Sequence, residues 1–239
     1  MELHEGGHDE QHTGAHWERL APGVARCRLP GWDATAGAVA GTAGVLVVDA
    51  GGSPAEGAGV RRGAEGLFGL PVTHVALTHP HFDHVLGASA FPGAVVHGTT
   101  GDAEELCRDA VAYGVPAGAA RDAAGRLPAA RPVDGEREIG LGGGRRVRLV
   151  ALGAAHSPDD LVVLVPGDPA VVFCGDLVEE SGEPQAGPDA SPGRWPAALD
   201  RLLELGGEDA VYVPGHGAVV DARFVREQRN ALARRFGVS

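Results

Sequence analysis

Four side chains that commonly ligate metals fall close together in the stretch Thr78-His79-Pro80-His81-Phe82-Asp83-His84. Neutral imidazoles and carboxylates are ligands that zinc, iron and manganese accept. An apolar run over residues 72–77 precedes the stretch and predicts a strand that ends at Thr78. Side chains two apart in an extended chain share a face, so His79 and His81 form one pair of ligands. Asp83 can begin a helix as its N-cap, which makes Asp83 and His84 a second pair.

This His-x-His-x-Asp-His pattern resembles the signature of the metallo-β-lactamase superfamily. Three further ligands follow in the order of that family: His156 within GAAHSP, Asp176 within FCGD and His216 within VPGHG. The resemblance extends from about Trp17 to the C-terminus, and all seven metal positions of the family are filled. The chain is most similar to small, generalist bacterial members of the superfamily.

The resemblance implies an α/β protein, a four-layer αβ/βα sandwich in a single domain. It also implies two divalent metal ions, Zn²⁺ with Fe or Mn as alternatives. One ion would be held by His79, His81 and His156, the other by Asp83, His84 and His216, and Asp176 would bridge both. Two divalent cations facing two carboxylates and a bridging hydroxide give a nearly neutral sum, which a cleft can hold at low desolvation cost.

A metal ion lowers the pKa of bound water from about 15.7 to ~7. The sequence therefore predicts a hydrolase that cleaves a small ester, thioester, lactone or amide through a metal-bound hydroxide. Asp83 is the predicted catalytic residue, because it binds metal and orients that hydroxide. Two other classes stay open: an iron-dependent dioxygenase acting on persulfides, which leaves His216 without a role, and a non-catalytic metal-binding protein. The complete second cluster favours the hydrolase.

Four more residues invite two interpretations each. Asp49 follows a buried run and resembles a family position that hydrogen-bonds a ligand histidine, but it also suits a turn before Gly51. Cys174 stands two residues before Asp176, so one interpretation places it close to the metal. The other, that it is a small buried apolar residue, is preferred. His74 and His97 are either additions to the metal site or structural histidines, and the structural interpretation is preferred for both.

The composition of the chain limits the classes of partner that it is expected to bind. The 20 basic residues against 32 acidic ones give a net charge of 20 − 32 = −12, which opposes nucleic acid and anionic membranes. The expected partner is a small-molecule substrate, with the oligomeric state open. Three cysteines without a Cys-x-x-Cys pair oppose a disulfide framework. With no apolar leader and no long apolar run, the predicted location is cytoplasmic.

Residues 1–16 are polar and glycine-rich and predict a disordered, histidine-rich arm, with weak metal capture as the alternative to a solvated tail. Residues 17–239 form the predicted metallo-β-lactamase-like domain. The expected strands are 24–29, 36–41, 45–49, 72–78, 95–98, 145–152, 161–165, 171–174 and 211–213, and the expected helices are 54–68, 102–113, 195–205 and 223–236. Residues 115–132 and 179–193 are expected to be irregular, the second as an acidic loop beside the metal site.

Overall fold

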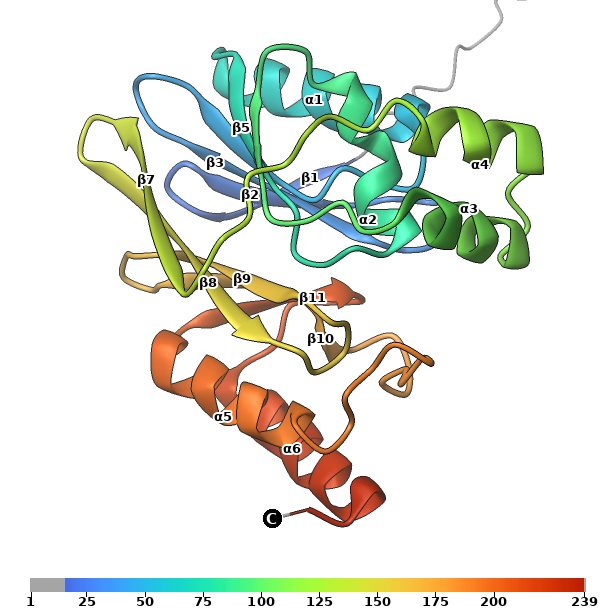
Figure 1. The fold of residues 1–239 in the computed structure, drawn as a ribbon. Helices are drawn as coiled ribbons and strands as arrows, with labels where there is room; N and C mark the ends of the chain where they lie inside the picture. Colours follow the sequence, from blue (N-terminus) through green and yellow to red (C-terminus); the bar gives the residue numbers. More distant parts are fainter. Residues whose placement is uncertain (1–15, 239) are drawn as a thin grey trace, which may run out of the picture.

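The computed structural model describes residues 16–238, and this part of the chain forms two mixed β-sheets (Figure 1). The first sheet has the order β1 (Trp17–Ala21), β2 (Val24–Arg28), β3 (Thr35–Ala40), β4 (Val45–Val48), β5 (Val72–Ala76) and β6 (Val95–His97). The second has the order β11 (Val211–His216), β10 (Val171–Glu179), β9 (Asp160–Val165), β8 (Arg145–Gly153) and β7 (Glu136–Gly142). Parallel pairs join β4 to β5, β5 to β6 and β10 to β11, and the other pairs are antiparallel.

Helices cover the outer face of each sheet (Figure 1). The first sheet carries α1 (Pro54–Phe68), α2 (Phe82–Val85), the 3₁₀ turn η1 (Leu86–Ala90), α3 (Ala103–Ala112) and α4 (Ala117–Ala124). The second carries α5 (Trp195–Gly206) and α6 (Ala222–Phe236).

Three hydrophobic cores separate these four layers. In β4, Val45 and Val47 face the helices of the first sheet, whereas Leu46 and Val48 face the second sheet. This alternation follows from the two-residue period of a strand, and it explains why β4 is apolar at every position. In β10, Phe173 likewise lies between the sheets, and its neighbours face α5 and α6. The four-layer αβ/βα sandwich predicted from the sequence is confirmed.

Helix α1 braces the segment that carries the histidine motif. Ser53 caps it by accepting a hydrogen bond from Glu56 N, and Pro54 stands at the first position. A Cβ atom at Gly57 would lie 2.2 Å from the carbonyl oxygen of Gly87, so only glycine lets α1 pack this closely on η1. The metal motif therefore rests on a rigid support.

Three elements were not predicted. Strand β1 is a half-exposed edge, and helix α4 lies inside the segment expected to be irregular. Ala120 and Ala123 form the buried face of α4, and small side chains at this spacing give only a weak helical signal. Strand β7 alternates Ile139 and Leu141 with polar or small residues, which is a period-two pattern broken up by glycines.

Two local predictions around the motif were wrong. Strand β5 ends at Ala76 rather than Thr78, so His79 and His81 lie in the loop after the strand. Helix α2 begins at Phe82 with His81 at the N-cap position, so Asp83 sits inside the first turn and caps nothing. Its side chain is thereby free to face the other acidic and imidazole groups.

The predicted arm over residues 1–16 lies, apart from His16, outside the described residues. Among residues 16–238, no helix has the length and apolar character that crossing a membrane requires.

Candidate metal centre

All seven predicted metal ligands lie at one edge of the two sheets. They come from the loop after β5 and the start of α2, from the turn between β8 and β9, from β10 and from the end of β11. Loops and strand ends on a packed scaffold are places where polar side chains can be held without disturbing the core. The first half of the chain supplies His79, His81, Asp83 and His84, and the second half supplies His156, Asp176 and His216.

The ligands form two clusters. In the first, which consists of His79, His81, His156 and Asp176, the ligand atoms lie within 4.8 Å of one another. Nε2 of His156 is 3.0 Å from Nδ1 of His81. In the second, which consists of Asp83, His84 and His216, the two Nε2 atoms are 3.4 Å apart. The pairs His79/His81 and Asp83/His84 that the sequence pattern predicted fall in different clusters, as the resemblance to the family implied.

Asp176 lies between the clusters. Its Oδ2 atom is 3.6 Å from His79 Nε2 in the first cluster and 3.4 Å from His216 Nε2 in the second. Its Oδ1 atom is 3.2 Å from His84 Nε2. A carboxylate in this place can contact two cations at once.

Every ligand histidine is held by its other ring nitrogen. The partners are Thr78 Oγ1 for His79 (2.9 Å), Asp189 Oδ2 for His81 (2.9 Å), Asp49 Oδ2 for His84 (2.9 Å), the Gln185 carbonyl for His156 (3.1 Å) and the Trp32 carbonyl for His216 (3.0 Å). Because a carbonyl oxygen only accepts, His156 and His216 donate from Nδ1, which leaves a lone pair on the Nε2 atom that faces the centre. Such partners orient a ligand imidazole and raise its basicity.

Asp49 combines both interpretations made for it. Its backbone has φ 58°, a left-handed turn conformation. Its carboxylate accepts hydrogen bonds from Thr78 N at 2.8 Å and Thr78 Oγ1 at 2.8 Å, and faces His84 Nδ1 at 2.9 Å. One buried side chain therefore ties the end of β4 to both ends of the histidine motif.

The residues fit a pair of divalent cations. The buried Nε2 atom of His79 has no hydrogen-bond partner among the described residues. Burial alone would lower the pKa of His216, but the Asp176 and Asp83 carboxylates outweigh it and raise that pKa to about 10. Burial alone would raise the pKa of Asp176, but the facing His84, His79 and His216 hold it well below its usual range. In the metal-free centre His216 therefore holds a proton that a divalent ion would displace, whereas Asp176 is already an anionic ligand.

Gly215 leaves room for the shared carboxylate. A Cβ atom at this position would lie 1.8 Å from Asp176 Oδ1, far inside van der Waals contact. The GH pair in VPGHG thus has two functions: His216 supplies a ligand, and the missing side chain of Gly215 lets Asp176 reach both clusters.

Asp160 shapes the turn that carries His156, and sequence reasoning missed it. Its buried carboxylate accepts hydrogen bonds from Ala155 N at 3.0 Å, from Ser157 N at 3.1 Å and from Ser157 Oγ at 2.8 Å. The signal available in the sequence was its place four residues after His156, in the turn-forming stretch Ser157-Pro158-Asp159-Asp160.

We expect Asp160→Ala to lower the free energy of unfolding of the metal-free protein by ~2–4 kcal/mol. The substitution leaves two backbone N–H groups without their acceptor, and each buried unsatisfied group costs ~1–3 kcal/mol. Urea denaturation measures this, with Asp159→Ala as the matched control, because Asp159 is exposed. Equal stability of the two variants would contradict the assigned role.

Three residues considered in the sequence lie outside the clusters. His74 and His97 contact each other, with Nδ1 of His74 3.1 Å from Nε2 of His97, as expected of structural histidines. Cys174 is buried in the core between the second sheet and α5 and α6. It is the small apolar residue that the sequence favoured.

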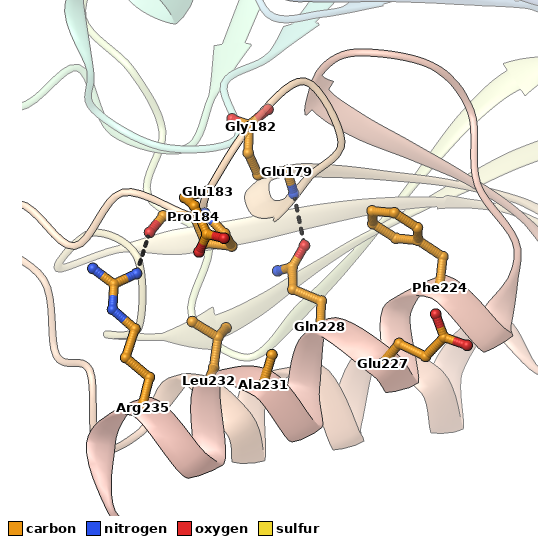
Figure 2. A pocket seen from close by; sticks show the side chains of 10 residues that line it. All are labelled: Glu179, Gly182, Glu183, Pro184, Phe224, Glu227, Gln228, Ala231, Leu232 and Arg235. Atoms are coloured by element: carbon orange, nitrogen blue, oxygen red, sulfur yellow. Dashed lines mark hydrogen bonds between the residues drawn. The ribbon is translucent and has the colours of Figure 1, made fainter.

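The acidic loop after β10 is secured by α6 on its outer side (Figure 2). Gln228 accepts a hydrogen bond from Glu179 N at 3.0 Å, and Arg235 donates one to the carbonyl of Pro184 at 2.9 Å. A cavity of about 360 Å³ lies between the helix and the loop, and none of the seven clustered ligands lines it. This cavity is separate from the metal centre.

Comparisons with known proteins agree with this geometry. The family model of the metallo-beta-lactamase superfamily matches residues 29–216. The 2,4-dinitroanisole O-demethylase subunit alpha of Nocardioides sp. (strain JS1661) is 30% identical over 185 residues, which are 75% of this chain and 51% of that protein. The chain spans about half the length of this curated relative.

Solved structures share the fold. The metallo-beta-lactamase FIM-1 from Pseudomonas aeruginosa, in its mono-zinc form, has a TM-score of 0.70 at 18% identity, covering 95% of this chain and 98% of that one. The metallo-beta-lactamase from Pontibacter korlensis has a TM-score of 0.68 at 20% identity, covering 91% of this chain and 98% of that one.

The fold and the clusters define an enzyme of the metallo-β-lactamase fold with a histidine and aspartate metal site. The chain belongs to the metallo-β-lactamase superfamily.

Proposed function

We propose that the chain is a dinuclear zinc hydrolase that cleaves a small ester, thioester, lactone or amide. The observation that carries the proposal is the pair of clusters that share Asp176, because a single ion would leave the second cluster without a function. Zinc is preferred to iron or manganese because the ligands are mostly imidazoles, and because a structural neighbour is a zinc form.

His79, His81 and His156 would hold one ion, Asp83, His84 and His216 the other, and Asp176 both. When bound, the ions supply Lewis acidity and make water acidic enough to react near neutral pH. Thr78, Asp49 and the carbonyls of Trp32 and Gln185 keep the imidazoles in place, so little reorganisation is needed during the reaction.

Asp83 is the proposed acid–base residue. Its Oδ2 atom is 3.4 Å from His216 Nε2 and 3.7 Å from His84 Nε2, so the carboxylate faces the centre. Asp83 would orient the attacking water and accept its proton at the carboxylate oxygen. As the bond from the carbonyl carbon to oxygen, sulfur or nitrogen breaks, the same proton would pass to the leaving group.

The other classes remain distinguishable by experiment. A persulfide dioxygenase would have no use for His216, whereas here His216 lies with Asp83 and His84. A non-catalytic metal-binding protein would bind the ions and turn nothing over. The curated relative is named for demethylation of 2,4-dinitroanisole, so an activated aryl methyl ether belongs in any substrate panel.

The proposed setting is a reducing cytoplasm with a small-molecule partner and neither nucleic acid nor membrane. Cys27, Cys107 and Cys174 are all free thiols, and two of them are buried. The net charge of −12 supports the absence of polyanionic partners.

We expect about two metal ions per chain after purification with added zinc. Elemental analysis measures the metal content, and the same preparation is screened against esters, thioesters, lactones, amides and 2,4-dinitroanisole. One ion or fewer per chain at saturating zinc would contradict the dinuclear centre. Two ions without turnover on the whole panel would support the non-catalytic alternative, and iron with oxygen consumption would support the dioxygenase.

A further inference from the structure

The acidic loop over residues 180–193 contacts the first cluster in two places. The Gln185 carbonyl lies 3.1 Å from His156 Nδ1, and Asp189 Oδ2 lies 2.9 Å from His81 Nε2. Main-chain groups also tie the loop to the turn of His156, since Ser191 N donates to the carbonyl of Ala155 at 2.8 Å. The loop therefore has a defined position at the centre, although it has no regular secondary structure.

His81 is the most exposed of the five ligand histidines, and it is the one that a side chain of this loop holds. Its side chain is 23% exposed, against 13% for His216 and 5% or less for the other three. The side chains of Thr78 and Asp49 hold His79 and His84, and the carbonyl of Trp32 holds His216. The loop also holds His156, but through the backbone carbonyl of Gln185, which a side-chain substitution leaves in place. Asp189 accepts the hydrogen bond of His81 from the loop, whereas the other ligand histidines have partners that are less exposed or belong to the backbone.

The direction of this contact determines what it does. Nδ1 of His81 faces His156 Nε2 at 3.0 Å, so Nδ1 is the atom that points into the first cluster. Nε2 then carries the proton and donates it to the Asp189 carboxylate. A carboxylate on the far nitrogen makes the ligating nitrogen more basic, and it holds the ring at the angle the cation needs.

We propose that Asp189 is a positioning residue which sets the metal affinity of the first cluster by holding His81 from the loop. The proposal rests on the proposed metal centre. It assigns a role to a carboxylate that is not itself one of the seven metal ligands. It also makes the loop part of the metal site: a displacement of residues 180–193 would loosen His81 and weaken one ion selectively.

The test compares Asp189→Asn and Asp189→Ala with the wild-type chain. Zn²⁺ and Co²⁺ affinities are measured by competition with a chromophoric chelator, which resolves two binding steps. We expect Asp189→Ala to weaken the first-cluster site by ~10–100-fold, the usual loss when such a partner is removed. The first-cluster affinity of Asp189→Asn should lie between those of the wild type and Asp189→Ala, because the amide oxygen still accepts the hydrogen bond but lacks the charge.

The second-cluster site should keep its affinity in both variants. The visible spectrum of bound Co²⁺ should change only for the ion in the first cluster. Glu183→Gln is the matched control, because Glu183 is an exposed acid of the same loop whose carboxylate contacts no ligand histidine. Asp189→Glu should recover part of the lost affinity. The melting temperature of the metal-free protein should remain that of the wild type, because the pair is partly exposed.

Unchanged affinity at both sites in Asp189→Ala would overturn the proposal. Equal weakening of both sites with a lower melting temperature of the metal-free protein would also overturn it, since that pattern marks a structural role. All these readouts are independent of turnover. A selective loss of one site in a protein that hydrolyses nothing would support this inference and reject the proposed hydrolase.

Discussion

We expect Asp83→Asn to lower turnover by ~10²–10⁴-fold at saturating metal, while one ion per chain stays tightly bound. The first cluster keeps His79, His81, His156 and Asp176, so its ion is retained. The second cluster loses a charged ligand and should bind its ion about tenfold more weakly or worse, in line with losses from ligand partners alone. Turnover falls further than occupancy explains, because an amide cannot accept the proton of the attacking water.

The assay is kcat on the best substrate from the panel, measured over a range of zinc concentrations up to saturation. Asp33→Asn is a suitable control. Asp33 follows Trp32, whose carbonyl holds His216, but the carboxylate of Asp33 pairs with Arg28 and not with a ligand histidine. If Asp83→Asn runs within a few-fold of the wild type at saturating zinc, Asp83 is a replaceable ligand and the proposed acid–base role is wrong.

The second large effect is expected from Gly215→Ala, which should reduce the metal content from two ions per chain to less than one. The new Cβ atom would lie 1.8 Å from Asp176 Oδ1 and 2.8 Å from the carbonyl carbon of Gly175. The carboxylate must move away, and because Asp176 lies between the clusters, both ions lose a ligand. Turnover should fall by ~10²-fold or more with the metal.

Elemental analysis measures the metal content of Gly215→Ala, and a thermal melting curve measures its stability. Gly66→Ala is the control, since a Cβ atom there meets no atom within 4 Å and the residue lies inside α1. That control should keep both ions and gain ~0.5–1 kcal/mol of stability, as alanine usually does in a helix interior. Two tightly bound ions in Gly215→Ala would show that Asp176 has more freedom than the structure gives it.

The seven clustered residues could be found from the sequence because their signal is local. Four of them stand within one short stretch, and His156, Asp176 and His216 each sit in a short glycine-containing motif of the kind the family uses. The pattern of elements alone predicted only a mixed α and β protein, and the four layers came from the resemblance to the family. The apolar strand β4 and the apolar first half of β10 agree with those layers, since both are buried on both faces.

The partners of the ligand histidines could not be found in this way. His156 and His216 donate to the carbonyls of Gln185 and Trp32, and any residue type supplies a carbonyl. Asp189 is separated from His81 by 108 positions and stands in a loop without periodicity, so nothing local connects the two. Only the fold brings these groups together.

The metal centre joins the two halves of the chain. Each cluster takes ligands from both sides of the interface between the sheets: His79 and His81 meet His156 in one, and Asp83 and His84 meet His216 in the other. Bound ions would therefore act as cross-links between the sheets, and their binding energy would be added to that of the core between them. At one hundred times the dissociation constant each ion contributes about 2.7 kcal/mol, so the stability of this fold would follow the free metal concentration of its surroundings.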